Sequence, residues 1–164
     1  MGGSELTHLD ASGRAQMVDV GDKPRSERWA VARGWVLMRA ETVEAILAGD
    51  MKKGDVRAAA ELAGVMAAKR THELIPLCHP LALTQVEVKV AFDTALPGAE
   101  IEARTRAYER TGVEMEALTA VAVAALTVYD MVKALDRAAR ITEIRLIEKH
   151  GGRSGDIVLE EPST

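Results

Sequence analysis

Two stretches in the middle of the chain alternate between apolar and polar residues. Over 84–92 every second residue is apolar, and over 100–107 apolar residues alternate with polar, mostly charged ones. The segment between them, 93–98, ends in Pro97 and Gly98, two residue types that favour turns. A period of two is typical of strands that bury one face and expose the other. The pattern therefore predicts an antiparallel hairpin with one face in water.

Two further stretches repeat their apolar residues with a helical period. The first covers 55–73, with Asp55 as a candidate N-cap. The second covers 113–140 and is the strongest helical pattern in the chain. Its middle part, 117–129, contains no charged residue, so we expect this helix to be buried on nearly all sides. The apolar stripe of the first helix comprises Val56, Ala59, Ala60, Ala63 and Ala67.

Short apolar segments at 34–39 and 142–149 have the composition of strands. The predicted order is then strand, helix, strand, strand, helix, strand, which is the order of a ferredoxin-like domain. We expect an α+β fold in which an antiparallel β-sheet packs against long helices. One domain is predicted over 17–158, with a flexible segment at 1–16 and a frayed tail at 159–164.

Composition and charge exclude several classes of protein. The 164 residues are 48% hydrophobic and 28% charged, which suits a chain with one buried core and not a disordered one. The net charge of −4 argues against non-specific nucleic-acid binding. No run of about 18 apolar residues predicts a membrane span, and the N-terminus has no apolar signal core. The single cysteine, Cys78, excludes an internal disulfide. We expect a cytoplasmic protein that binds neither nucleic acid nor membrane.

Four charged residues occupy positions that suit chemistry at a charged ligand. Asp130 and Lys133 lie three apart, on one face near the end of the long predicted helix. Such a pair is either a coupled acid and base or a plain helix-end ion pair. Lys53 precedes the first helix, where it either binds a phosphate or stays solvated in a turn. Lys69 shares a stripe with apolar residues, so it either extends to solvent or points into a pocket.

The segment 75–80 contains two prolines, Pro76 and Pro80, and Cys78 and His79 lie between them. Adjacent residues of an extended segment point to opposite sides, so these two do not form a nucleophile–base pair with each other. His79 suits a general-acid or hydrogen-bonding role, and the alternative is a histidine satisfied within the fold. No histidines have the spacing of metal ligands, so we expect no metal site.

Charged residues also gather at the start of the long helix and near the end of the chain. Glu114 and Glu116 open the helix, where the helix dipole favours carboxylates whatever their function. The segment 149–155 is rich in glycine and contains Lys149 and Arg153. It lacks the residue order of a P-loop, but it could close over an anion.

Six runs of residues together point to one protein family. They are MVDV at 17–20, KGDV at 53–56, LIPLCHPL at 74–81, TGVEMEALT at 111–119, YDM at 129–131 and KHGGRSG at 149–155. These runs resemble the MoaC family of molybdenum cofactor biosynthesis, the cyclic pyranopterin monophosphate synthases. They occur in that family's order, and the two longest are highly specific. Gly21 stands where serine is common in the family, Ser26 where threonine is common, and Arg153 where lysine is common.

The resemblance implies a lyase with a GTP-derived substrate. It implies conversion of (8S)-3′,8-cyclo-7,8-dihydroguanosine 5′-triphosphate to cyclic pyranopterin monophosphate, with release of pyrophosphate. Asp130 would be the catalytic acid/base, with Lys133 as its partner and Lys53 at the charged or transferring groups. No resident cofactor is implied, and whether Mg²⁺ accompanies the triphosphate stays open. The residues implied in substrate binding are Leu77, Cys78, His79, Met115, Glu116, Glu114, Lys69, Arg28, Lys149 and Arg153.

The length of the long helix bears on how such a site is assembled. Glu116 and Asp130 are 14 residues apart, or about 21 Å at a rise of about 1.5 Å per residue. One nucleotide could hardly be held closely by both from one chain, so we expect a site shared between two chains. The resemblance implies a homo-oligomer, a hexamer built as a trimer of dimers with sites at the dimer interface.

Two other functions are compatible with the residues taken singly. A non-catalytic nucleotide-binding or regulatory domain would use the same fold, and it would keep its function in an Asp130→Asn variant. A structural oligomer would use the alanine-rich long helix as an interface and would bind no small ligand. The positions of Lys53 and Lys69 favour a ligand over the structural role.

Overall fold

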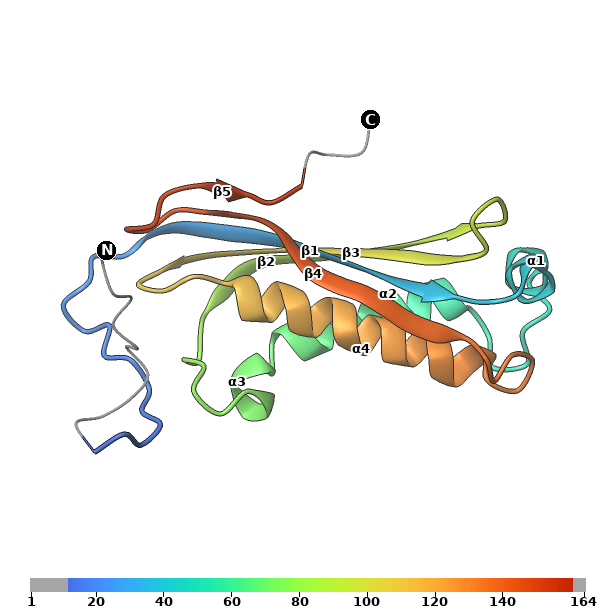
Figure 1. The fold of residues 1–164 in the computed structure, drawn as a ribbon, viewed down its shortest axis with the longest axis horizontal. Coiled ribbons are helices and arrows are strands. Elements are labelled where there is room, and N and C mark those ends of the chain that lie inside the picture. Colours follow the sequence, from blue (N-terminus) through green and yellow to red (C-terminus); the bar gives the residue numbers. More distant parts are fainter. Residues whose placement is uncertain (1–11, 161–164) are drawn as a thin grey trace.

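A five-stranded antiparallel sheet lies against a layer of helices, and helix α4, Glu114–Val132, runs along the sheet (Figure 1). The computed structural model describes residues 12–160. The strand order is β2-β3-β1-β4-β5, which confirms the predicted α+β, ferredoxin-like fold. The elements are β1 Ser26–Leu37, α1 Ala40–Ala48, α2 Val56–Ala68, α3 Thr71–Leu74, β2 Leu83–Asp93, β3 Gly98–Glu109, α4 Glu114–Val132, β4 Arg140–His150 and β5 Ile157–Val158.

The predicted hairpin is formed by β2 and β3. Val90 pairs with Ile101, and both side chains are buried on the face that packs against the helices. The neighbouring pair, Lys89 and Glu102, lies on the opposite face. The alternation in the sequence therefore marks one buried and one polar face, as predicted.

The first strand is longer than the sequence predicted. β1 begins at Ser26, eight residues before the predicted start of the 34–39 segment. Its core-facing positions are filled by small residues such as Ala30 and Ala32, which are fully buried. Its other face carries Trp29 and a buried Arg33. This mixture of small, aromatic and charged residues conceals the alternation.

The first predicted helix is two helices rather than one. Asp55 caps α2 as predicted, because its carboxylate accepts a hydrogen bond from the Ala58 N–H at 3.0 Å. The predicted span of 55–73 is interrupted at Lys69, the C-cap of α2, and the short α3 follows. The sequence patterns did not predict α1 or β5.

The long helix is shorter and less buried than predicted. α4 ends at Val132 instead of continuing to 140. The chain turns at Asp136, a buried carboxylate that accepts the Arg39 N–H at 2.8 Å and the Ala138 N–H at 3.1 Å. Leu126 in the apolar middle is 57% exposed, so the expectation of burial on nearly all sides is wrong for the isolated chain.

Small residues let α4 approach its neighbours closely. A Cβ at Gly64 of α2 would lie 3.0 Å from the Ala120 carbonyl oxygen of α4. A Cβ at Gly34 of β1 would lie 2.8 Å from Cγ1 of Val121. The alanines of α4, such as the fully buried Ala124, fill the narrow space between sheet and helix.

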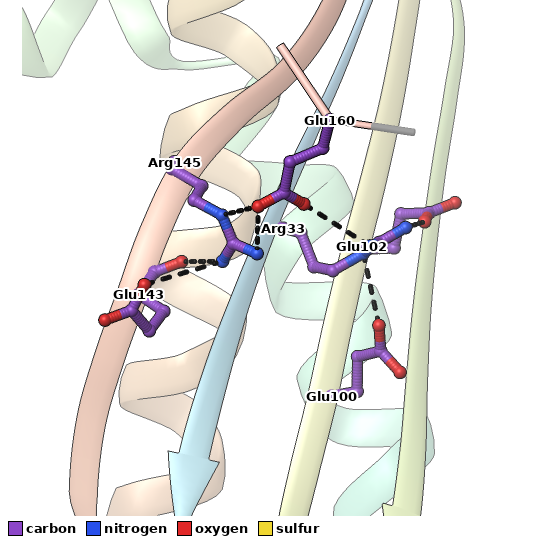
Figure 2. Close-up of polar contacts among 6 residues, drawn as sticks. All are labelled: Arg33, Glu100, Glu102, Glu143, Arg145 and Glu160. Atoms are coloured by element: carbon purple, nitrogen blue, oxygen red, sulfur yellow. Dashed lines mark hydrogen bonds and ion pairs between the residues drawn. The ribbon is translucent and has the colours of Figure 1, made fainter. Parts of the chain in front are cut away.

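Ion pairs join the strands on the outer face of the sheet (Figure 2). The Arg33 guanidinium on β1 lies 2.8 Å from Glu102 and 3.1 Å from Glu100, both on β3. Arg145 on β4 lies 2.6 Å from Glu160, which is also 3.7 Å from Arg33. Arg33 is only 8% exposed, so several carboxylates compensate a nearly buried cation. The network links β1, β3 and β4 on the side away from the helices.

The predicted ends of the domain lie at the limits of what the structure describes. Most of the segment predicted to be flexible, 1–16, and most of the predicted tail, 159–164, lie outside the described residues. Leu159 is described, and its N–H donates to the Ile147 carbonyl oxygen at 2.8 Å. The domain boundaries stay a prediction.

By length and composition alone, α4 would pass as a membrane-spanning helix. In this fold it lies between the sheet and α2, with Ala120, Ala124 and Val128 fully buried. Core helices commonly have this composition, so the helix is weak evidence for a membrane.

We predict that Gly64→Val lowers the free energy of unfolding by about 1–3 kcal/mol, because the side chain would overpack the contact between α2 and α4. The matched control is Ala58→Val on the exposed side of α2, which should cost only about half a kcal/mol of helix propensity. Urea unfolding at one fixed protein concentration measures both. Equal costs for the two variants would contradict the close contact.

Candidate active site

A carboxylate held by two lysines lies at the C-terminal end of α4. Lys53 Nζ is 2.8 Å from Asp130 Oδ2, and it also donates to the Asp130 carbonyl oxygen at 2.8 Å. Lys133 Nζ is 2.6 Å from Asp130 Oδ1. Asp130 and Lys133 share a face at the helix end, and Lys53 reaches them from the loop before α2. The structure thus brings together the three residues predicted to be catalytic.

The two ammonium groups determine the charge state of Asp130. Hydrogen bonds from Lys133 and then Lys53 lower the pKa of Asp130 to about 2. The same hydrogen bond to Asp130 raises the pKa of Lys133. At neutral pH the cluster is therefore one carboxylate between two cations, with all three side chains about half exposed. While both lysines bind it, the carboxylate is a weak base.

A second group of predicted residues lines a cavity of about 290 Å³ at the other end of α4. The loop after α3 brings Leu77, Cys78 and His79 against the first turn of the helix, which contributes Met115 and Glu116. The Nε2–H of His79 donates to the carbonyl oxygen of Val18 at 2.8 Å, which orients the imidazole. A histidine that is hydrogen-bonded within the fold is the alternative considered from the sequence, and a role for His79 at the substrate stays a prediction.

Glu116 is a nearly buried carboxyl group in this cavity, with 4% of the residue exposed. Burial raises its pKa to about 7; a hydrogen bond to the backbone opposes the shift, and the charge of Glu114 adds to it. Burial also raises the pKa of the Cys78 thiol, and Glu116 and Glu114 add to that shift. The cavity therefore contains a carboxyl group that can exchange a proton near neutral pH, beside a protonated thiol.

A larger cavity of about 510 Å³ adjoins the first and has a strongly basic lining. The two cavities share Lys23, Thr111, Gly112 and Glu114. The only acidic side chain among the lining residues, Glu114, forms an ion pair with Lys149. We call this cavity the basic cleft; its basic side chains are Lys23, Arg28, Arg110, Lys149 and Arg153.

The basic cleft depends on a glycine at a crowded position. Gly152 has φ +84°, and a Cβ there would lie 1.6 Å from Nη1 of Arg28. The Arg28 guanidinium is itself fixed by the backbone, because its Nε donates to the Glu109 carbonyl oxygen at 3.2 Å. The loop backbone can therefore lie directly against a fixed cation, which suits recognition of an anion.

Lys69 is the one predicted site residue that lies apart from the Asp130 cluster and from both adjoining cavities. It is exposed at the end of α2 and lines a separate hollow with Val65 and Leu83. Two basic residues of the cleft, Lys23 and Arg110, were missed by sequence reasoning. Arg110 directly precedes the TGVEMEALT run and Lys23 follows MVDV closely, so their positions beside matching runs were the available signal.

No metal-binding cluster of three or more His, Cys, Asp or Glu residues occurs within residues 12–160. The carboxylate of the basic cleft, Glu114, is paired with Lys149, so the lining suits an anion rather than a divalent cation. The absence of a resident metal ion or cofactor stays a prediction.

Comparisons with known proteins give one consistent family. The model of the MoaC family matches residues 17–152. The chain is 63% identical over 155 residues to the cyclic pyranopterin monophosphate synthase of Roseiflexus sp. (strain RS-1), covering 94% of this chain and 98% of that protein. The protein of the same name from Thermomicrobium roseum is 63% identical over 152 residues, covering 93% of this chain and 92% of that protein.

We predict that the free energy of unfolding falls as the pH rises in the wild-type protein and that Glu116→Gln removes this fall. The folded carboxyl group keeps its proton up to pH about 7, whereas the unfolded one releases it near pH 4.5. Ionisation of the unfolded chain therefore lowers the free energy of unfolding as the pH rises through this window, by roughly 3 kcal/mol in total. Urea unfolding from pH 4 to 8 measures the effect, with exposed Glu73→Gln as the control. An unchanged pH slope in Glu116→Gln would contradict the raised pKa.

Proposed function

Because the chain belongs to the MoaC family, we propose that it is a cyclic pyranopterin monophosphate synthase. The reaction would convert (8S)-3′,8-cyclo-7,8-dihydroguanosine 5′-triphosphate to cyclic pyranopterin monophosphate and release pyrophosphate, as a lyase of molybdenum cofactor biosynthesis. The observation that carries the proposal is the 63% identity, over 94% of this chain, with a protein of that name. We place the reaction in the cytoplasm.

The charge of the basic cleft supports a triphosphate-bearing substrate. Five basic side chains face one carboxylate there, and that carboxylate is already paired with Lys149. Arginines such as Arg28 and Arg153 present N–H groups in a planar fork that matches phosphate oxygens. We propose that the substrate places its phosphates in the basic cleft. Any Mg²⁺ would then be held by the phosphates rather than by the protein.

The cavity beside the cleft supports binding of the pterin-forming part of the substrate. Leu77 and Met115 offer apolar surface, and Cys78 and His79 add polar groups. Glu116 exchanges its proton near pH 7, so it could both donate to and accept from a ring nitrogen or hydroxyl during the rearrangement. We propose that these five residues contact the base and sugar.

The cluster at the other end of α4 supports the acid/base chemistry. Asp130 is a weak base while Lys53 and Lys133 bind it, because their charges stabilise its ionised form. An anionic substrate would attract one of the ammonium groups and so raise the basicity of the carboxylate. The displaced lysine would remain beside the transferring phosphate and stabilise its charge. We propose this exchange of partners as the step that activates Asp130.

The separation of the two groups supports a site built from two chains. They lie at opposite ends of α4, and Glu116 is 14 residues from Asp130, about 21 Å along the helix axis. The helix layer also leaves Leu62, Met66 and Leu126 about half exposed or more, an apolar surface available to another subunit. We propose a homo-oligomer, a hexamer assembled as a trimer of dimers, in which Asp130 of one chain completes the cleft of its neighbour. An active monomer in light scattering would contradict this assembly.

We predict that Asp130→Asn and Lys133→Ala each slow single-turnover conversion of the cyclised dihydro-GTP by at least about 100-fold, because each removes part of the acid/base pair. Formation of pterin product and of pyrophosphate are followed together. The matched controls are Asp50→Asn and Lys52→Ala, two exposed residues of the α1–α2 loop.

Two results would contradict the proposal. Wild-type rates in both variants would remove Asp130 and Lys133 from the chemistry. A wild-type protein that binds the substrate but releases no pyrophosphate would instead be the non-catalytic nucleotide-binding domain considered from the sequence.

A further inference from the structure

A histidine with no role in the proposed chemistry lies directly behind the basic cleft. His150 is the last residue of β4, and the glycine-rich loop 151–155 follows it. Its Nδ1 is 3.0 Å from Asp156 Oδ2 and its Nε2 is 3.2 Å from Glu148 Oε2. Both ring nitrogens thus face carboxylates, an arrangement fully satisfied only by the doubly protonated imidazolium.

Asp156 connects this histidine to the backbone of the loop. Its second oxygen, Oδ1, accepts the Gly151 N–H at 3.1 Å. The first residue of the loop is therefore bound to the carboxylate of the residue that follows the loop. Within the loop, the Gly155 N–H donates to the Gly152 carbonyl oxygen at 3.1 Å and forms a turn. The pair of His150 and Asp156 closes the base of the loop.

The back of the sheet fixes the imidazole itself. The His150 ring stacks on the Trp29 indole, with centroids 3.6 Å apart and planes 13° from parallel. The Arg104 guanidinium lies 5.1 Å from the Trp29 ring centroid, and it is 3.9 Å from the Glu148 carboxylate. The histidine is therefore held by β1, β4 and the loop at once.

The register of β1 and β4 connects this cluster to the cleft. Trp29 pairs with His150, and the next pair is Ala30 with Lys149. Neighbouring residues of a strand point to opposite faces, so Arg28 and Lys149 face the cleft while Trp29 and His150 lie behind it. The loop that His150 and Asp156 close supplies three further cleft residues, Gly152, Arg153 and Ser154.

We infer that His150 and Asp156 are positioning residues, which hold the glycine-rich loop against the basic cleft and so set its affinity for the phosphate groups of the substrate. This inference rests on the proposed function, which identifies the substrate as one that carries a triphosphate. Arg153 belongs to this loop, and the loop backbone at Gly152 lies against the Arg28 guanidinium, so the arrangement of these cleft groups depends on how firmly the loop is held. Ordering the loop before binding lowers the entropy lost when phosphate binds.

The contact should weaken as His150 loses its proton. Burial lowers the pKa of His150, but the hydrogen bonds to Asp156 and Glu148 raise it by more, so the net shift is upward. Arg104, on β3, is the cation of this cluster, and it lies over the Trp29 ring on which His150 stacks. Above this raised pKa the neutral ring has one N–H for two carboxylates, so the contact is complete below the pKa and weakened above it.

The test uses inorganic tripolyphosphate as the probe and the full chain as the protein. His150→Ala and Asp156→Ala should weaken binding by roughly tenfold, the effect of about 1.4 kcal/mol, in calorimetric titrations at pH about 6. Asp156→Asn should fall between these variants and wild type, because it keeps an acceptor for Gly151 but loses the charge. His72→Ala and Asp50→Ala, both at exposed positions outside the cleft, are the matched controls.

Two further measurements separate positioning from general damage. Hydrogen–deuterium exchange should show loss of protection at the Gly151 amide in Asp156→Ala, with the core strands unchanged. The difference in tripolyphosphate affinity between wild type and His150→Ala should become smaller as the pH rises to about 9. Turnover by His150→Ala should show a raised KM with an unchanged kcat. Affinities equal to the controls, or weaker binding with unchanged Gly151 protection, would overturn the inference.

The inference and the proposed function can fail separately. A protein that binds tripolyphosphate through the loop but gives no pterin product supports the positioning role and overturns the synthase. A protein that turns over normally with an unchanged KM in both alanine variants overturns the positioning role alone. Wild type that does not bind tripolyphosphate overturns the assignment of the cleft on which the positioning role depends.

Discussion

The packing of α4 along the sheet is the constraint on which the rest of the structure depends. Glycine and alanine on β1, α2 and α4 allow backbone approaches that larger side chains would prevent, as at Gly34 and Gly64. The helix is therefore fixed in place as a rigid rod of 19 residues, Glu114–Val132. Glu116 and Asp130, the two carboxyl groups proposed to act on the substrate, lie near its opposite ends, and the rod sets the distance between them. In the proposed account, one chain therefore carries two halves of a site that do not face each other.

The two ends differ in their electrostatics, and the difference matches their proposed roles. At the N-terminal end Glu116 is buried without a cation of its own, so it keeps its proton to about pH 7. At the C-terminal end Asp130 is exposed between two lysines, so it stays ionised down to pH about 2. Lys53 also binds the Asp130 carbonyl oxygen, where the helix dipole favours a cation. One carboxyl group is thus available as a proton carrier, and the other is restrained until its cations move.

The sequence predicted well what local pattern controls. The β2–β3 hairpin follows from alternation, and the cap at Asp55 follows from its place before an apolar stripe. The end of α4 could not be predicted, because the residues after Val132 have a helical composition and the turn depends on Asp136 binding the distant Arg39 N–H. For the candidate site, the matching runs include Lys53 and Asp130 of one group and Cys78 and Glu116 of the other. They do not include Lys23 or Arg110. The stacking of His150 on Trp29 could not be predicted, because these two residues are far apart in the chain.

Subunit complementation tests the central claim, a site assembled from the two ends of α4 in different chains, most directly. Asp130→Asn and Glu116→Gln are each expected to be inactive as pure proteins. When they are unfolded, mixed equally and refolded together, half of the dimers should be mixed, and each mixed dimer should contain one intact site. The mixture should then recover about a quarter of wild-type turnover. A mixture that stays as inactive as its components would place both carboxyl groups in one chain's site and contradict the account.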